Sequence, residues 1–241
     1  MIGNKANVDA FDRDAASRGG YVYTDRVRLS SRFANARISQ AILAAAEPKG
    51  RRVVDLGCGD GAYTTEFVQA GAREVLGIDP APTAVAKAQR AAAGFVGCSF
   101  EVRSVYKMPR PGDERFDVAV LRGVLHHLRD PEAAVAAALR TARNVVILEP
   151  NGLNPVLKVL ERVSPYHRAH EEQSFLPGTI DRWCERGGGR VTSRAHVNLV
   201  PMFCPDWLAT LSRCFEPVVE RVPGLRSLAC GQYLVTATAL E

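Results

Sequence analysis

The feature that most constrains this chain is an apolar run that ends in an acidic residue and closely spaced glycines. It reads Val53-Val54-Asp55-Leu56-Gly57-Cys58-Gly59-Asp60-Gly61, and a second apolar run at 73–79 ends in Asp79. Glycine allows sharp turns and close approach of a ligand to the backbone, and the first strand-to-helix turn of a doubly wound α/β sheet is where such folds bind nucleotides. The pattern therefore predicts an α/β nucleotide-binding fold.

Two cofactor classes fit the glycine spacing. Gly57, Gly59 and Ala62 satisfy the loose dinucleotide pattern G-x-G-x-x-A, with Asp79 at about the expected 20 residues further on. Asp55 favours another ligand, because a carboxylate beside the turn repels a pyrophosphate and attracts an ammonium group. Asp79 suits the hydroxyls of a ribose without phosphate. Together they describe S-adenosylmethionine (SAM); a dehydrogenase site and a turn that binds nothing are the alternatives.

The chain resembles the class I SAM-dependent methyltransferases, in particular the branch of the ubiquinone and menaquinone methylases. The resemblance covers residues 51–150 and includes the segments 116–120, 124–131 and 145–150. It implies a Rossmann-like, doubly wound, mostly parallel seven-stranded α/β sheet with an antiparallel last strand and helical insertions in the C-terminal half. It also implies a set of SAM-binding residues: Asp55, Gly57, Cys58, Gly59, Asp79, Pro80, Ser104, Val105, Arg122 and Tyr21.

Several of these positions carry a more specific expectation. Where the family usually has an acidic residue near the adenine amine, this chain has Ser104, so the hydroxyl or the following backbone amides would hold the ring. Arg122 is expected to present its backbone to the methionyl end, and Cys58 to pack in the glycine turn. Tyr21 or Tyr23 would cover the sulphonium through a cation–π contact, or simply pack on the surface.

Composition fits one methyltransferase domain over 1–241. At 241 residues and 46% hydrophobic residues the chain can bury a full core, divided into a lead-in and helix (1–50), a SAM-binding half (51–150) and substrate or lid segments with the last two strands (151–241). No apolar run approaches the ~20 residues of a membrane span, so a cytoplasmic protein without a membrane partner is expected. A homodimer is compatible with the sequence.

Charge and cysteine content exclude other classes. The net charge of +5 comes from scattered arginines without an aromatic ladder, which does not favour a nucleic-acid partner. The six cysteines form no C-x-x-C pair, so reduced thiols are expected and neither a zinc ribbon nor a redox motif is indicated.

Strands and helices are expected to alternate along the chain. The first helix would be capped by Ser30 or Ser31 and end near Glu47. The segments 151–178 and 200–226 would build the acceptor pocket and lid, or else a helical buttress or dimer surface. Strands are expected at 51–56, 73–79, 98–103, 116–121, 144–149, 190–198 and 232–240, and further helices at 62–70, 82–93, 131–142, 155–163, 179–186 and 205–215, with an apolar turn at 218–222.

Methyl transfer from a sulphonium is an in-line displacement, so the protein mainly has to align donor and acceptor in a dry cleft. An alcohol or acid acceptor also needs a base. His126 and His127 follow the fourth strand at the carboxyl edge of the sheet and are the candidates, although a histidine there can instead bond the backbone.

Acceptor binding is predicted for Glu149, Asn151, His167 and His170. His167-x-x-His170-Glu171 matches no common structural-zinc pattern, so no metal is expected. The sequence thus predicts a SAM-dependent methyltransferase for a small-molecule acceptor, with O-methylation slightly favoured. An RNA or protein methyltransferase, and a cofactor-binding scaffold of the same fold without activity, are the alternatives.

Overall fold

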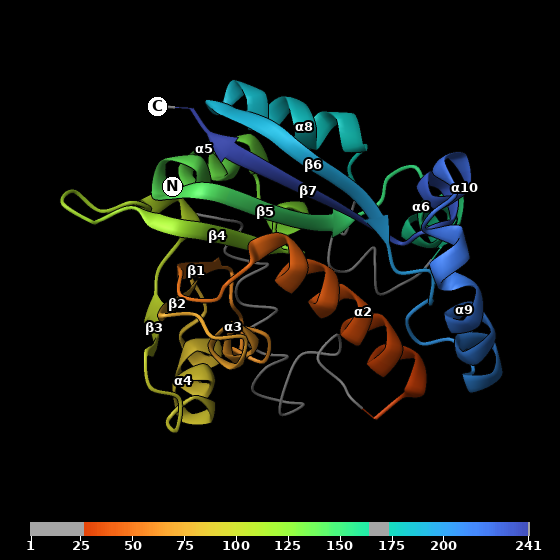
Figure 1. Ribbon diagram of the computed structural model, residues 1–241, viewed down its shortest axis with the longest axis horizontal. Helices are drawn as coiled ribbons and strands as arrows, with labels where there is room; N and C mark the ends of the chain where they lie inside the picture. The colour runs from red at the N-terminus through yellow and green to blue at the C-terminus, as the bar shows by residue number, and fades with distance from the viewer. Residues whose placement is uncertain (1–26, 164–173, 241) are drawn as a thin grey trace.

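The computed structural model describes residues 27–163 and 174–240, which form a twisted sheet covered by helices on both faces (Figure 1). The strand order is β3-β2-β1-β4-β5-β7-β6. Strands pair in parallel except β7, which runs antiparallel to both β5 and β6. This confirms the expected Rossmann-like sheet. The strands are β1 Arg52–Leu56, β2 Glu74–Asp79, β3 Cys98–Val102, β4 Phe116–Arg122, β5 Ala142–Pro150, β6 Gly189–Val197 and β7 Gln232–Ala239.

The helices follow start signals that the sequence shows plainly. Proline stands at the first turn of several of them, where its missing N–H costs nothing, and the Asp130 carboxylate caps α5 by accepting from the Ala133 amide at 2.9 Å. Two 3₁₀ turns, η2 Val105–Lys107 and η3 Leu125–His127, follow β3 and β4. The helices are α2 Leu29–Ala46, α3 Thr64–Gln69, α4 Pro82–Ala91, α5 Pro131–Thr141, α6 Pro155–Val163, α8 Pro177–Arg186, α9 Asp206–Val219 and α10 Pro223–Ala229.

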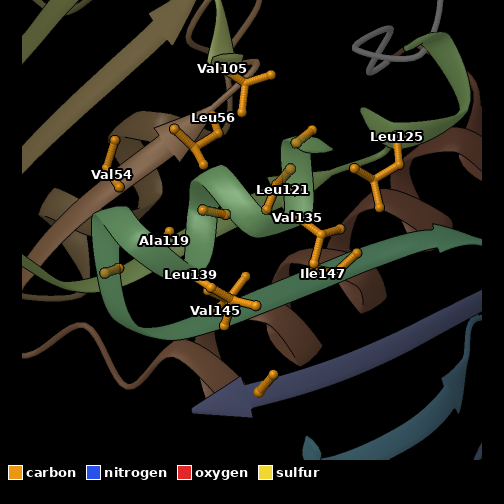
Figure 2. Close-up of a cluster of buried hydrophobic side chains, with 14 of the residues drawn as sticks. Val54, Leu56, Val105, Ala119, Leu121, Leu125, Val135, Leu139, Val145 and Ile147 are labelled. Carbon is orange, nitrogen blue, oxygen red and sulfur yellow. The ribbon is translucent and has the colours of Figure 1, made fainter. Parts of the chain in front are cut away.

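The core has one apolar layer on each face of the sheet. Because side chains alternate along a strand, Val54 and Leu56 of β1 point to one face and Val53 to the other. On the first face they pack with Leu121, Ile147 and the α5 side chains (Figure 2). On the second face the α2 side chains cover the sheet. With both faces buried, the central strands β4 and β5 contain continuous apolar runs, as is typical of parallel sheets.

Two sequence predictions are corrected by the structure. Ser30 and Ser31 do not cap α2, which begins at Leu29 with Arg28 in the cap position and buries both serines in its first turn. The helix expected to end at Phe215 continues through Pro217 to Val219, and the sequence analysis assigned no helix of its own to the segment that forms α10. The buried Glu216 carboxylate bonds the Leu199 amide and holds this end of α9 in place, which local sequence rules do not register.

The carboxyl ends of β1, β2, β4 and β5 meet at one edge of the sheet. In open α/β sheets this edge is where ligands bind. The loops that carry the glycine turn, Asp79 and the histidine pair all leave the sheet here. All six cysteines are unbridged, as expected. Over the described ranges, every helix is too short or too polar to cross a bilayer.

Candidate active site

The turn after β1 needs glycine for two separate reasons. Gly57 has φ +85°, a conformation that side chains disfavour, and a Cβ there would lie 2.6 Å from a methyl carbon of Val124. The amides of Gly57 and Cys58 both donate to the Ile78 carbonyl, at 2.8 and 3.0 Å. The turn is thereby held against the end of β2 and against the loop after β4, which leaves its backbone at the sheet edge.

Asp79 ties the glycine turn to the start of α4. One carboxylate oxygen accepts from the Gly59 amide at 3.0 Å, and the other accepts from the Ala81 amide at 2.9 Å. Pro80 separates Asp79 from Ala81 in the sequence. The two hydrogen bonds fix the Asp79 carboxylate at the carboxyl end of β2. A carboxylate offers about four acceptor positions, so Asp79 can accept hydroxyl donors of a ligand in addition to these amides.

Asp55 lies in a drier setting at the end of β1. Its side chain is 5% exposed and accepts a 2.6 Å hydrogen bond from the Thr64 hydroxyl. Burial raises the pKa of the Asp55 carboxyl to about 6, against the opposing effects of the Thr64 hydroxyl and of the positive charge on Arg122. A cation placed next to Asp55 would therefore be bound strongly, since it would compensate a buried charge.

Arg122 reaches the same place with its side chain. The guanidinium carbon lies 3.4 Å from the centroid of the Tyr63 ring, and its nitrogens donate to Ser39 Oγ at 2.8 Å and Asn35 Oδ1 at 3.3 Å. The expectation that the Arg122 backbone faces the ligand stays a prediction. The Arg122 side chain lines the same cavity as Asp55.

These groups surround a small cavity of about 40 Å³, whose polar lining is Ser39, Asp55, Cys58, Tyr63, Glu66 and Arg122. The cavity carries charges of both signs. Burial raises the pKa of the Cys58 thiol, so this side chain is neutral and packs in the turn. Tyr63, Glu66, Asn35 and Ser39 were missed from sequence because α2 and α3 are helices without a motif, and only the fold brings them to β1.

The histidine pair is organised by a glutamate that ends β5. Glu149 is fully buried, and one of its oxygens accepts from the amides of Val124 and Leu125 at 2.8 and 2.7 Å. The other oxygen lies 2.6 Å from His126 Nδ1, and the His127 ring contacts the His126 ring with centroids 3.8 Å apart and ring planes tilted by 49°. When Nδ1 carries the proton, Nε2 of His126 keeps its lone pair and can accept.

The remaining predicted residues are placed as follows. Ser104 and the buried Val105 follow β3 beside the site, because the Arg103 amide donates to the Asp79 carbonyl at 2.9 Å. Asn151 is buried, and its amide donates to the carbonyls of Ser227 and Cys230 at 2.8 and 2.9 Å.

The known contacts of Glu149 and Asn151 are thus internal, and acceptor binding by either stays a prediction. Tyr21, Tyr23, His167 and His170 lie outside the described residues. The described residues contain no cluster of three potential metal ligands.

Comparison with known proteins places this site in a family. Residues 53–152 match a methyltransferase domain family. A ubiquinone biosynthesis O-methyltransferase of Hahella chejuensis is 33% identical over 151 residues, which cover 56% of this chain and 60% of that protein. A tRNA U34 carboxymethyltransferase of the same organism is 30% identical over 175 residues, covering 66% and 52%. The chain spans less than two thirds of the length of these relatives.

Comparison with solved structures gives the same fold. The crystal structure of magnesium protoporphyrin IX methyltransferase from Synechocystis with bound SAH superposes with a TM-score of 0.63 at 16% identity, over 96% of this chain and 99% of that one. At this identity the likeness shows the fold. Residues 53–152 therefore belong to a methyltransferase domain family, and the sheet has the strand order of the class I SAM-dependent methyltransferases.

Proposed function

We propose that this chain binds SAM and transfers its methyl group to a small-molecule acceptor. The observation that carries the proposal is the position of Asp55 and Asp79 at one glycine turn, with Arg122 and Asp55 both lining a small cavity there. A ligand that suits this arrangement has a pair of hydroxyls at one end and a zwitterionic group at the other.

The chemistry of the donor set fits SAM. Asp79 would hold the ribose hydroxyls, Asp55 the methionyl ammonium and Arg122 the methionyl carboxylate. The absence of a side chain at Gly57 leaves the backbone within reach of the ligand. When bound, SAM supplies a methyl group on a positively charged sulphur. The chain's part is to orient donor and acceptor and to keep water out.

We further propose His126 as the base for a hydroxyl acceptor, which makes O-methylation the favoured reaction. Glu149 orients the imidazole through Nδ1, so that Nε2 is the nitrogen that takes the acceptor proton. Glu149 acts here as a positioning residue, since its second oxygen is held by the backbone of η3. The His127 ring, in contact with His126, would limit the rotation of the His126 ring.

The relative named as a tRNA-modifying enzyme makes a nucleic-acid acceptor the second candidate. Such an acceptor requires a continuous cationic surface beside the cleft. On α6, α9 and α10, which lie at the same edge of the sheet, the exposed side chains are mainly apolar. This favours a small molecule over RNA.

Calorimetric titration with SAM, S-adenosylhomocysteine and NAD tests the cofactor assignment. We expect both adenosyl compounds to bind and NAD not to bind. Release of S-adenosylhomocysteine in the presence of a panel of phenols and catechols then tests methyl transfer. We expect His126→Gln to lower the turnover number by roughly 10²-fold or more with SAM affinity within about twofold of the native value.

Binding of NAD alone would overturn the cofactor assignment. Tight SAM binding without turnover on any hydroxyl, amine or carbon acceptor would instead support the scaffold alternative. Turnover that is unchanged in His126→Gln would remove the base from the proposal and leave the SAM site standing.

A further inference from the structure

Three C-terminal helices present an unusual amount of apolar surface to solvent. Eleven large apolar side chains on or next to α6, α9 and α10 are each at least 38% exposed. We name this set the C-terminal apolar face. It consists of Leu153, Val156, Val159, Leu160, Trp207, Leu211, Phe215, Val218, Val222, Leu225 and Leu228.

The spacing of these residues shows that α9 is turned outward. Trp207, Leu211 and Phe215 follow one another at intervals of four, and Val218 continues the same stripe to the end of α9. Residues at such intervals share one face of a helix. The fully buried positions of α9 are Ala209 and Glu216, on the opposite side. An ordinary surface helix buries its apolar stripe, whereas α9 exposes it.

The three helices form one continuous and firmly held surface. The Asn154 side-chain amide, at the start of α6, donates to the carbonyls of Ala229 and Cys230 at the end of α10, at 3.1 and 3.3 Å. Arg37 of α2 pairs with Glu220 just after α9. Figure 1 shows α6, α9 and α10 gathered beyond one end of the sheet. The apolar residues are therefore exposed by the fold rather than by a loose segment.

The charges around the face are mostly positive. Within residues 155–162 and 205–229, the exposed charged side chains are Arg162, Arg213 and Arg221 against Asp206. Arg213 pairs with the buried Glu216, which leaves Arg162 and Arg221 as the arginines that make this face positive. A second copy that packed on this face through a two-fold axis would bring these arginines toward each other, which is unfavourable. An anionic surface matches both features, since Trp, Phe and Leu beside arginine are typical of helices that lie in a lipid interface.

We propose that the C-terminal apolar face docks on the surface of an anionic lipid bilayer. Lying on a bilayer requires no spanning segment, so the proposal departs from the expectation of no membrane partner, which rested on the lack of an apolar run long enough to span. β5 leads into α6, and α10 leads into β7, so the face adjoins the same sheet edge as the candidate active site. The proposal is independent of whether methyl is transferred.

Tryptophan fluorescence gives a direct test. The chain has two tryptophans, so Trp183→Phe leaves Trp207 as the reporter on the face. We expect its emission to shift to the blue, and to be quenched by brominated acyl chains, with vesicles of 70% phosphatidylcholine and 30% phosphatidylglycerol but not with phosphatidylcholine alone. Cosedimentation with the same vesicles should measure the partition coefficient.

Variants separate the apolar and the charged contributions. Leu211→Ser with Phe215→Ser should lower the partition coefficient at least about tenfold, because the stripe loses its apolar contact. Arg162→Gln with Arg221→Gln should lower it roughly thirtyfold. Val96→Ser, at a residue that is 95% exposed elsewhere, and Arg190→Gln are the matched controls and should change neither.

Failure to bind either vesicle would overturn the proposal, as would equal binding to both. A dimer in sedimentation velocity that Leu211→Ser dissociates, without vesicle binding, would assign the face to a second copy and also overturn it. Calorimetry with SAM on the same variants keeps the two proposals apart, since we expect unchanged affinity whether or not the face binds lipid.

Discussion

The cofactor edge of the sheet, which carries Asp55, Asp79 and Glu149, and the C-terminal apolar face differ in the residue types that they bury. At the cofactor edge, acidic groups are carried into the interior, and Asp55, Asp79 and Glu149 each hold hydrogen bonds within the protein. At the apolar face, Trp207 and Phe215 remain 68% and 56% exposed while the acidic Glu216 is buried below them. A buried acid costs free energy that a bound cation or hydrogen-bond donor would offset. An exposed apolar stripe costs free energy that contact with another surface would offset.

Each region therefore carries groups that a second molecule would satisfy, the buried acids in the first and the exposed apolar side chains in the second. Ligand affinity at the cofactor edge should change when its polar groups are removed and when the pH changes. Substitutions in the C-terminal apolar face should leave the stability of the free protein unchanged and alter only its binding to a partner.

Asp79→Ala should have the largest effect on ligand binding. Its carboxylate would lose the hydrogen bonds to the ribose and also its hold on the Gly59 amide. With charge-assisted hydrogen bonds at about 1.5–3 kcal/mol each, we expect SAM affinity to fall roughly hundredfold or more. Isothermal titration measures this. Asp113→Asn, in the exposed β3–β4 loop, is the control, and native affinity in Asp79→Ala would refute the ribose assignment.

Among substitutions at the cofactor edge, Glu149→Leu should have the largest effect on stability. It leaves the amides of Val124 and Leu125 buried without their acceptor. At about 1–3 kcal/mol for each unsatisfied group, the free energy of unfolding should fall by roughly 3 kcal/mol, measured by urea denaturation. For a chain of this length the melting temperature should fall by about 6–12 °C.

Glu149→Gln is the matched control for this prediction. It keeps one carbonyl oxygen for the two amides, so its loss of stability should be smaller than that of the leucine variant. Equal stability of the native, Gln and Leu proteins would show that Glu149 does not hold the turn.

The same contrast explains how much could be predicted from sequence. The glycine turn, Asp79 and the alternation of strands and helices follow from short local patterns, because strand, tight turn and helix are specified within a few residues. The mostly parallel seven-stranded sheet was implied by the family resemblance. The cavity partners Tyr63 and Arg122 do not, since their meeting depends on how α3 packs beside the end of β4. The sequence did not predict that Glu149 holds the turn after β4, although it does show an acid at the end of an apolar strand.

The C-terminal half was harder to predict for a different reason. The apolar spacing of α9 indicated a helix, but sequence periodicity cannot tell which face turns inward when the partner is absent. The helix was expected to end at Phe215, whereas α9 continues through Pro217 to Val219 and the Glu216 carboxylate accepts from the Leu199 amide there. Tertiary contacts therefore decided both the length of α9 and its orientation.

Asp55 makes SAM affinity depend on pH. The buried carboxyl has its pKa raised to about 6, and an ammonium group binds to its charged form. Below pH 6 the proton must leave before the ligand binds, so affinity should fall about tenfold for each pH unit. Titrations between pH 5 and 8 check this, and Asp55→Asn should bind weakly at every pH in that range. A flat profile in the native protein would contradict the assignment.

The stability of the unliganded protein should change in the opposite sense. Below the ordinary value of 3.8 Asp55 is protonated in both folded and unfolded chains, and between 3.8 and about 6 only the folded chain keeps the proton. Because the folded-state pKa is raised, this contribution to stability is lost as pH rises through that window. Asp55→Asn should therefore stabilise the unliganded protein at pH 8, by about 1–3 kcal/mol in urea denaturation.

The smallest effect on the free energy of unfolding is expected for a substitution at Leu211 of the apolar face. A substitution at Leu121 of the core provides the comparison. Leu121→Ala opens a cavity at a side chain that is 0% exposed and should cost about 2–5 kcal/mol. Leu211→Ala removes a side chain that is 49% exposed in a helix that alanine favours, so the free energy of unfolding should stay within about 0.5 kcal/mol. A loss above about 1 kcal/mol at Leu211 would mean that the stripe is covered in solution. The contrast between a satisfied interior and an unsatisfied surface would then fail, and with it the reason to expect a lipid partner.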